Sequence, residues 1–155
     1  MLLTASAITA HGASIHGPAR WDKPALTVHV GDQDAWAGTD VAAAIDQWAA
    51  AFPMTLVDQA DADVVLTTGP ARTGDVGATA RTATEGSTIT GCRVDLPAKH
   101  AGKDMTDVLT HELGHCLGLG HLVDGPAVMY WTELSDNLSP TVTKVDVAAV
   151  RALYR

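Results

Sequence analysis

The alternation of apolar and polar residues along the chain predicts five strands. Residues 25–30 alternate and are rich in β-branched side chains, which is typical of a strand with one buried face. Residues 62–67 are almost continuously apolar, which favours a strand at the centre of a sheet. Further strands are expected at 54–57, at 76–81, where the pattern is weak, and at 88–96.

Three other segments carry apolar residues at three- and four-residue spacing, the period of a helix with one buried face. These segments are 39–51, 104–117 and 143–154. Asp104 can cap the second helix, and Thr143 with Asp146 has the spacing of a capping box at the start of the third. The order of one strand, one helix, four strands and two helices predicts an α+β fold with a mixed sheet.

Composition and charge narrow the class of protein. The chain has 155 residues, the size of one domain, and is 46% hydrophobic and 18% charged, which is typical of a folded globular protein. Its net charge of −8 and the lack of a Lys/Arg cluster argue against nucleic acid as a binding partner. The apolar runs fall short of the ~20 residues of a membrane-spanning helix. We therefore expect a monomer that binds neither nucleic acid nor a membrane.

The N-terminal part of the chain lacks the patterns of the rest. Residues 1–10 form a short apolar stretch that Thr and Ser interrupt and that no basic leader precedes, and residues 9–18 show no periodicity. We therefore expect a flexible segment over 1–19 and a folded domain over 20–155.

The strongest chemical signal is the run HELGHCLGLGH at 111–121. On a helix, His111 and His115 are four residues apart and about 40° apart around the axis, so their imidazoles reach one point. Glu112 lies about 100° from His111, near such a point but off the line of the two histidines. It is thus placed to hold a water rather than the metal.

His121 can join the other two histidines only if the helix ends and the chain reverses. Gly118 is the residue that can adopt a positive φ at a helix end. Three neutral imidazole nitrogens leave one position open on a tetrahedral zinc ion, as catalytic sites require. The spacing therefore predicts one catalytic zinc ion held by His111, His115 and His121.

This run resembles the zinc signature HExxHxxGxxH of the metzincin clan of metallopeptidases. The matching positions are His111, Glu112, His115, Gly118 and His121. The sequence AVMY at 127–130 resembles the clan's Met-turn, in which Met129 would form a hydrophobic floor beneath the zinc. Within the clan, residues 20–154 are most similar to the matrixins and their compact bacterial relatives.

The resemblance implies a metzincin-type zincin fold: a twisted, mixed five-stranded sheet with an N-terminal, an active-site and a C-terminal helix, and a cleft between an upper and a lower subdomain. It also implies a secreted zinc metalloendopeptidase that cleaves proteins or peptides by a metal-activated water, with Glu112 as general base. No matrixin segment for structural zinc and calcium is visible between Gly69 and Asp95, so the sequence does not support bound calcium.

The resemblance further implies that an extended substrate pairs with an edge strand, for which 76–81 is the candidate. The candidate substrate-binding residues are Val76, Gly77, Ala78, Thr79 and, at the wall of a side-chain pocket, Tyr130. Two other functions remain open. One is a protein-binding module that keeps the zinc but does not cleave, and the other is a peptidase of cell-wall peptides.

The chain has two cysteines, Cys92 and Cys116. An even pair, with one cysteine in a strand just before the helix that carries the other, favours a disulfide. Two buried free thiols are the alternative.

Overall fold

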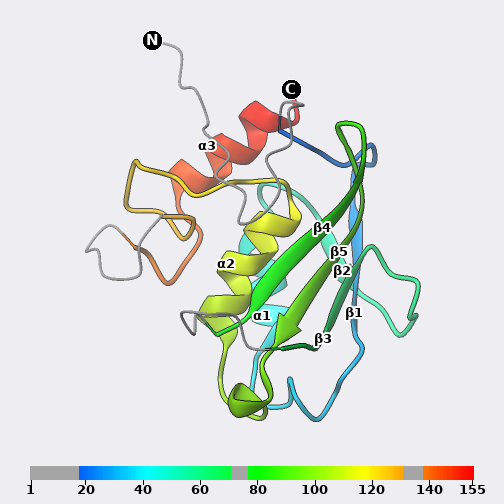
Figure 1. The fold of residues 1–155 in the computed structure, drawn as a ribbon. Helices are drawn as coiled ribbons and strands as arrows, with labels where there is room; N and C mark the ends of the chain where they lie inside the picture. The colour runs from blue at the N-terminus through cyan, green and yellow to red at the C-terminus, as the bar shows by residue number, and fades with distance from the viewer. Residues whose placement is uncertain (1–17, 71–76, 131–137) are drawn as a thin grey trace.

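A computed structural model describes residues 18–70, 77–130 and 138–155 of the chain. Its strands form one five-stranded mixed sheet in the order β2-β1-β3-β5-β4 (Figure 1). Neighbours from β2 to β5 run parallel, whereas β4 pairs antiparallel with β5 and forms one edge. The strands are β1 (Leu26–Val30), β2 (Met54–Leu56), β3 (Val64–Thr68), β4 (Thr79–Glu85) and β5 (Thr88–Leu96).

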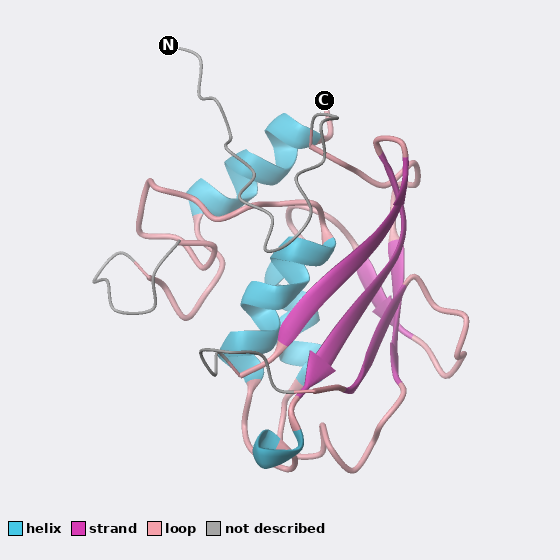
Figure 2. Cartoon of the chain, in the orientation of Figure 1, coloured by secondary structure: helices cyan, strands magenta, loops and turns pink. Residues whose placement is uncertain are grey.

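Two helices pack together against one face of this sheet (Figure 2). They are α1 (Val41–Trp48) and α2 (Thr106–Cys116), and α2 also contacts β4 and β5. A short 3-10 helix, η1 (Ala98–His100), precedes α2, and α3 (Lys144–Leu153) ends the chain. The predicted α+β fold, with a five-stranded mixed sheet and three helices, is confirmed. The helices within the described residues are all too short or too polar to span a membrane.

The core lies between the sheet and the two packed helices. Alternate side chains of β1 are buried while those between them are half-buried, so one face of the strand points to the helices. Trp48 of α1 is fully buried, and its indole N–H donates to the Thr110 carbonyl of α2 at 2.9 Å. β3 lies at the centre of the sheet, as its continuous apolar sequence predicts.

The structure shifts several of the predicted element boundaries, among them those of α1, which spans Val41–Trp48 and not 39–51, and of β3, which spans Val64–Thr68 and not 62–67. α2 begins at Thr106 with Met105 as its N-cap residue, although the Asp104 carboxylate still accepts the Thr106 N–H at 3.0 Å. The weak strand predicted at 76–81 is β4, which begins at Thr79 and extends to Glu85. Gly77 precedes it with a φ of 80°, a left-handed conformation that sequence periodicity does not reveal.

A disulfide joins the sheet to the last turn of α2. Cys92 of β5 is bonded to Cys116, with a sequence separation of 24 residues and the two Cα atoms 5.5 Å apart. The pairing favoured by the sequence is therefore present. Cys92 is in turn paired with Val64 of the central strand β3, so the bond fixes the end of α2 to the middle of the sheet.

Removing this cross-link should destabilise the domain without abolishing its core. We expect the double variant Cys92→Ala/Cys116→Ala to lower the free energy of unfolding by about 2–4 kcal/mol, because the unfolded chain gains freedom in a loop of this length. Chemical denaturation followed by tryptophan fluorescence measures the change. Wild-type protein treated with a reductant should show the same loss, and equal stability of the oxidised and reduced forms would contradict the assigned role.

Candidate metal centre

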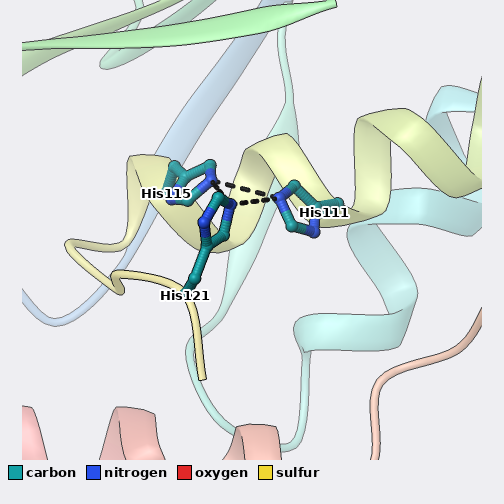
Figure 3. Close-up of side chains that lie close together, drawn as sticks. All are labelled: His111, His115 and His121. Atoms are coloured by element: carbon teal, nitrogen blue, oxygen red, sulfur yellow. Dashed lines mark hydrogen bonds between the residues drawn. The ribbon is translucent and has the colours of Figure 1, made fainter. Parts of the chain in front are cut away.

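Three imidazoles converge at the C-terminal part of α2 (Figure 3). His111 and His115 lie one turn apart on the helix, and His121 comes from the segment that follows it. The Nε2 atoms of His111 and His115 are 3.1 Å apart, and each lies 3.2 Å from Nε2 of His121. Among the described residues these three form the one cluster of side chains that could hold a metal ion.

The other ring nitrogen is hydrogen-bonded to the backbone in two of these histidines. Nδ1 of His111 lies 2.6 Å from the Val128 carbonyl oxygen, and Nδ1 of His115 lies 2.8 Å from the Leu119 carbonyl oxygen. Because a carbonyl only accepts hydrogen bonds, both Nδ1 atoms carry a proton. In a neutral imidazole the lone pair is then on Nε2, which faces the other histidines.

Burial keeps two of the imidazoles neutral. Burial, assisted by the charge that His111 can carry, lowers the pKa of His115 to about 3. Burial likewise lowers the pKa of His121, again with a contribution from His111. A neutral imidazole is the form that binds metal ions.

The cluster fits a zinc ion in both geometry and chemistry. Nitrogen ligands about 2.0–2.1 Å from a tetrahedral zinc ion lie about 3.3 Å from one another, close to the spacing of the three Nε2 atoms. The acceptor nitrogens of His111 and His115 repel each other at this spacing, and a divalent cation turns that repulsion into attraction. Three histidines with one coordination position left over are the ligand set of catalytic zinc sites.

The third histidine is placed by the way α2 ends. Gly118 follows the helix with a φ of 96°, its N–H donates to the His115 carbonyl, and the Leu119 N–H donates to the Gly114 carbonyl. This pair of bonds is a Schellman motif, which reverses the chain direction after a helix. The prediction of a glycine-dependent reversal between the second and third histidines is confirmed.

Side chains from the two ends of the domain complete this helix terminus. The Trp21 indole N–H donates to the Cys116 carbonyl, and the Tyr154 hydroxyl donates to the Leu117 carbonyl, both at 2.7 Å. Burial raises the pKa of Tyr154, which keeps that hydroxyl protonated as a donor. The carbonyl groups that a helix end leaves without intrahelical partners are thus hydrogen-bonded here.

We expect Gly118→Ala to lower the free energy of unfolding by more than ~2 kcal/mol and to weaken zinc binding. A left-handed backbone conformation costs a non-glycine residue about 1–2 kcal/mol, and a Cβ atom at Gly118 would lie 2.3 Å from the Ala19 carbonyl oxygen. Chemical denaturation and zinc content after dialysis measure the two effects.

Gly86→Ala is the matched control, because Gly86 has a φ of 59° but a Cβ atom there would meet no heavy atom of the described residues within 4 Å. The free energy of unfolding of Gly86→Ala should fall only by the cost of the left-handed backbone, and this variant should keep its zinc. Equal losses in the two variants would contradict a specific role for the Gly118 turn.

Glu112 lies beside the histidines and is tied to the edge strand. It is 8% exposed, and its Oε2 atom accepts the N–H of Ala80 in β4 at 2.6 Å. The spacing of the motif indicates that Glu112 lies near the cluster but does not indicate its partner in β4. A backbone donor 32 residues away leaves no local pattern in the sequence.

Met129 packs directly against α2 between the two helical histidines. It is fully buried, and a Cβ atom at Gly114 would lie 2.2 Å from its sulfur and 2.9 Å from the Trp48 ring. Gly114 therefore lets the methionine approach the helix backbone closely. The role of Met129 as a floor beneath a zinc ion stays a prediction.

Asp146 is a buried residue of this region that the sequence indicates only in part. It forms the predicted capping box with Thr143 at the start of α3. Its carboxylate also accepts the backbone N–H groups of Val128 and Met129, at 2.9 and 3.0 Å. Since the Val128 carbonyl contacts His111, one carboxylate connects α3 to the histidine cluster.

We expect Asp146→Ala to lower the free energy of unfolding by about 3 kcal/mol or more. The change leaves two buried N–H groups without an acceptor, at about 1–3 kcal/mol each, and removes the Asp146 half of the capping box, which accepts the Thr143 N–H. Urea denaturation measures the loss. Asp107→Ala, which removes an exposed acid from the first turn of α2, is the control and should change stability by less than ~1 kcal/mol. Similar losses in both variants would show that the hydrogen bonds from Val128 and Met129 to Asp146 contribute little to stability.

The residues expected to bind substrate fall in different environments. Gly77 and Ala78 are buried before β4, and Thr79 is the half-buried first residue of that strand. Tyr130 directly follows Met129 and is half-buried, while Val76 and residues 131–137 lie outside the described residues. Their role in substrate binding stays a prediction.

The sheet, the helices and the histidine cluster define an α+β protein with a site suited to a metal ion. The family model of the matrixins, peptidase family M10, matches residues 10–155, and the chain therefore belongs to the matrixin family.

Two relatives share part of the sequence. Matrilysin of Rattus norvegicus is 44% identical over 55 residues, which are 35% of this chain and 21% of matrilysin. Metalloendoproteinase 1-MMP of Arabidopsis thaliana is 45% identical over 51 residues, which are 33% of this chain and 14% of that protein. These segments cover a small part of the relatives' own lengths.

Proposed function

We propose that the chain is a zinc-dependent endopeptidase that hydrolyses peptide bonds in proteins or peptides. The observation that carries this proposal is the arrangement of His111, His115 and His121, whose Nε2 atoms lie within 3.2 Å of one another. Membership of the matrixin family and the partial identity to two metallopeptidases support it.

The three histidines would hold one zinc ion. A zinc ion with such ligands supplies Lewis acidity, which polarises a peptide carbonyl and lowers the pKa of a water to about 7. The Nδ1 bonds to the Val128 and Leu119 carbonyls orient the rings of His111 and His115 for this role. Met129 would line the site beneath the ion as an apolar floor.

Glu112 would act as the general base. Its carboxylate would take a proton from the attacking water and later pass it to the leaving amine. Ala80 holds one carboxylate oxygen, and the surrounding burial restricts competing water. A module that only binds protein would have no use for such a base beside the histidines.

An extended substrate would pair with the outer edge of β4, the edge that faces away from β5. The Ala80 N–H lies on this edge, because it donates to Glu112 and not to the neighbouring strand. The outer edge of β4 therefore passes close to the proposed base. A peptide added there as a further strand would have its backbone fixed beside the site.

We further propose that residues 20–155 form the catalytic domain and that this domain acts outside the cell as a monomer. Residues 1–17 of the segment expected over 1–19 lie outside the described residues. The disulfide between Cys92 and Cys116 supports an oxidising compartment.

We expect Glu112→Gln to retain one equivalent of zinc and to lose cleavage by at least ~100-fold, the usual contribution of a general base. Glutamine keeps the shape of the side chain but accepts no proton. Metal analysis and the hydrolysis of casein and of a mixture of fluorogenic peptides measure the two properties. If the variant hydrolyses casein at the wild-type rate, Glu112 is not the general base.

The wild-type protein provides the control for the proposed activity. Its cleavage should stop with phenanthroline and return when zinc is added. A wild-type protein that binds zinc but cleaves no peptide would instead favour a binding module. Mass spectrometry of products from protein and from cell-wall peptides separates the two substrate classes.

A further inference from the structure

The outer face of β4 and β5 carries a cluster of charged side chains next to the outer edge of β4. Because side chains alternate along a strand, Arg81 points away from the core against which its neighbour Ala80 packs. Arg81 is paired across the strands with Arg93 of β5. Both are more than half exposed, at 51% and 60% of the side chain.

One buried carboxylate holds both guanidinium groups. Nε of Arg81 lies 3.3 Å from Oδ2 of Asp95, and Nε of Arg93 lies 3.2 Å from Oδ1. Asp95 is fixed in place: its side chain is 6% exposed, and a Cβ atom at Gly69 would lie 2.6 Å from its Cβ. Two cations share one anion, so the cluster of Arg81, Arg93 and Asp95 keeps one positive charge on a chain whose net charge is −8.

Arg81 retains donors for a second carboxylate. Among the described residues its ion-pair partner is Asp95, through Nε. The terminal nitrogens of a guanidinium can bind another carboxylate in a bidentate manner. Since Asp95 already orients the group, Arg81 loses less side-chain freedom when an anion binds.

We propose that Arg81 selects substrates with an aspartate or glutamate at the residue that pairs opposite it on the outer edge of β4. This inference rests on the proposed endopeptidase function and on substrate pairing with β4. Residues directly opposite each other in an antiparallel pair have Cβ atoms about 4.5–5.5 Å apart. A carboxylate at that substrate position is within reach of Arg81, whereas Arg93 lies one strand, about 4.8 Å, further from the edge.

The size of the preference follows from the exposure of the pair. Exposed ion pairs contribute little, so we expect kcat/KM for a glutamate peptide to exceed that of the matching glutamine peptide by about three- to fivefold. A lysine peptide should be cleaved more slowly than the glutamine peptide. The preference should shrink as ionic strength rises from about 0.05 M to about 0.5 M, because salt screens exposed charges.

The test uses the zinc-loaded full chain and a neutral peptide that the wild-type protein cleaves at one bond. Each flanking position is changed in turn to glutamate, glutamine or lysine, and kcat/KM is measured for every peptide. One position should show the preference in the wild-type protein. Arg81→Gln should abolish that preference, Arg81→Glu should reverse it in favour of lysine, and Arg81→Lys should keep part of it.

Arg93→Gln is the matched control, because it removes the second arginine that is paired with Asp95 but leaves Arg81 at the edge of the sheet. It should keep the preference, and it should cleave the glutamine peptide within about twofold of the wild-type rate. Circular dichroism checks that the variants fold.

The outcomes separate this inference from the proposed function. Normal cleavage with no charge preference at any position, or a preference that Arg81→Gln leaves intact, would overturn the role of Arg81 alone. An equal loss of the glutamate preference in Arg81→Gln and Arg93→Gln would overturn it too. The preference would then depend on the overall charge of the cluster and not on the residue at the edge of the sheet. A wild-type protein that cleaves none of the peptides would overturn the endopeptidase function and this inference together.

Discussion

The reversal of the chain after α2 is the constraint on which the site depends. A straight helix would carry His121 away from the other histidines, at about 1.5 Å per residue. The positive φ of Gly118 ends the helix, and the bonds from Gly118 and Leu119 to the preceding turn close it. Two histidines from a helix and one from the next segment can therefore face one point.

This helix end is held from several distant parts of the chain. The disulfide attaches it to the centre of the sheet, and Trp21 and Tyr154 hydrogen-bond its last carbonyl groups. Asp146 fixes the segment that contacts His111. Each bond restrains a different element, so the histidines have little freedom to move apart. A site built in this way is ordered before a ligand binds, which reduces the entropy that binding must overcome.

The sequence predicts the parts of this arrangement that depend on near neighbours. The four-residue spacing of His111 and His115, the glycine after the helix and the capping box of α3 each concern residues within one or two turns. The central position of β3 also followed from local composition, because its sequence is almost continuously apolar. Features of this kind produce a recognisable pattern of residues in the sequence, so they can be predicted from it.

The contacts that orient the site leave no such pattern. Trp21 reaches Cys116 across 95 positions, and Ala80 reaches Glu112 across 32. The capping box explained Asp146 completely at the local level, so nothing indicated that the same carboxylate also accepts two N–H groups from the segment around Met129. Buried donors must find acceptors, but which acceptor each finds is decided by the packing of whole elements. The local sequence therefore predicts which chemical groups form the site. Their orientation is set by the tertiary structure, and the rate of a reaction depends on this orientation.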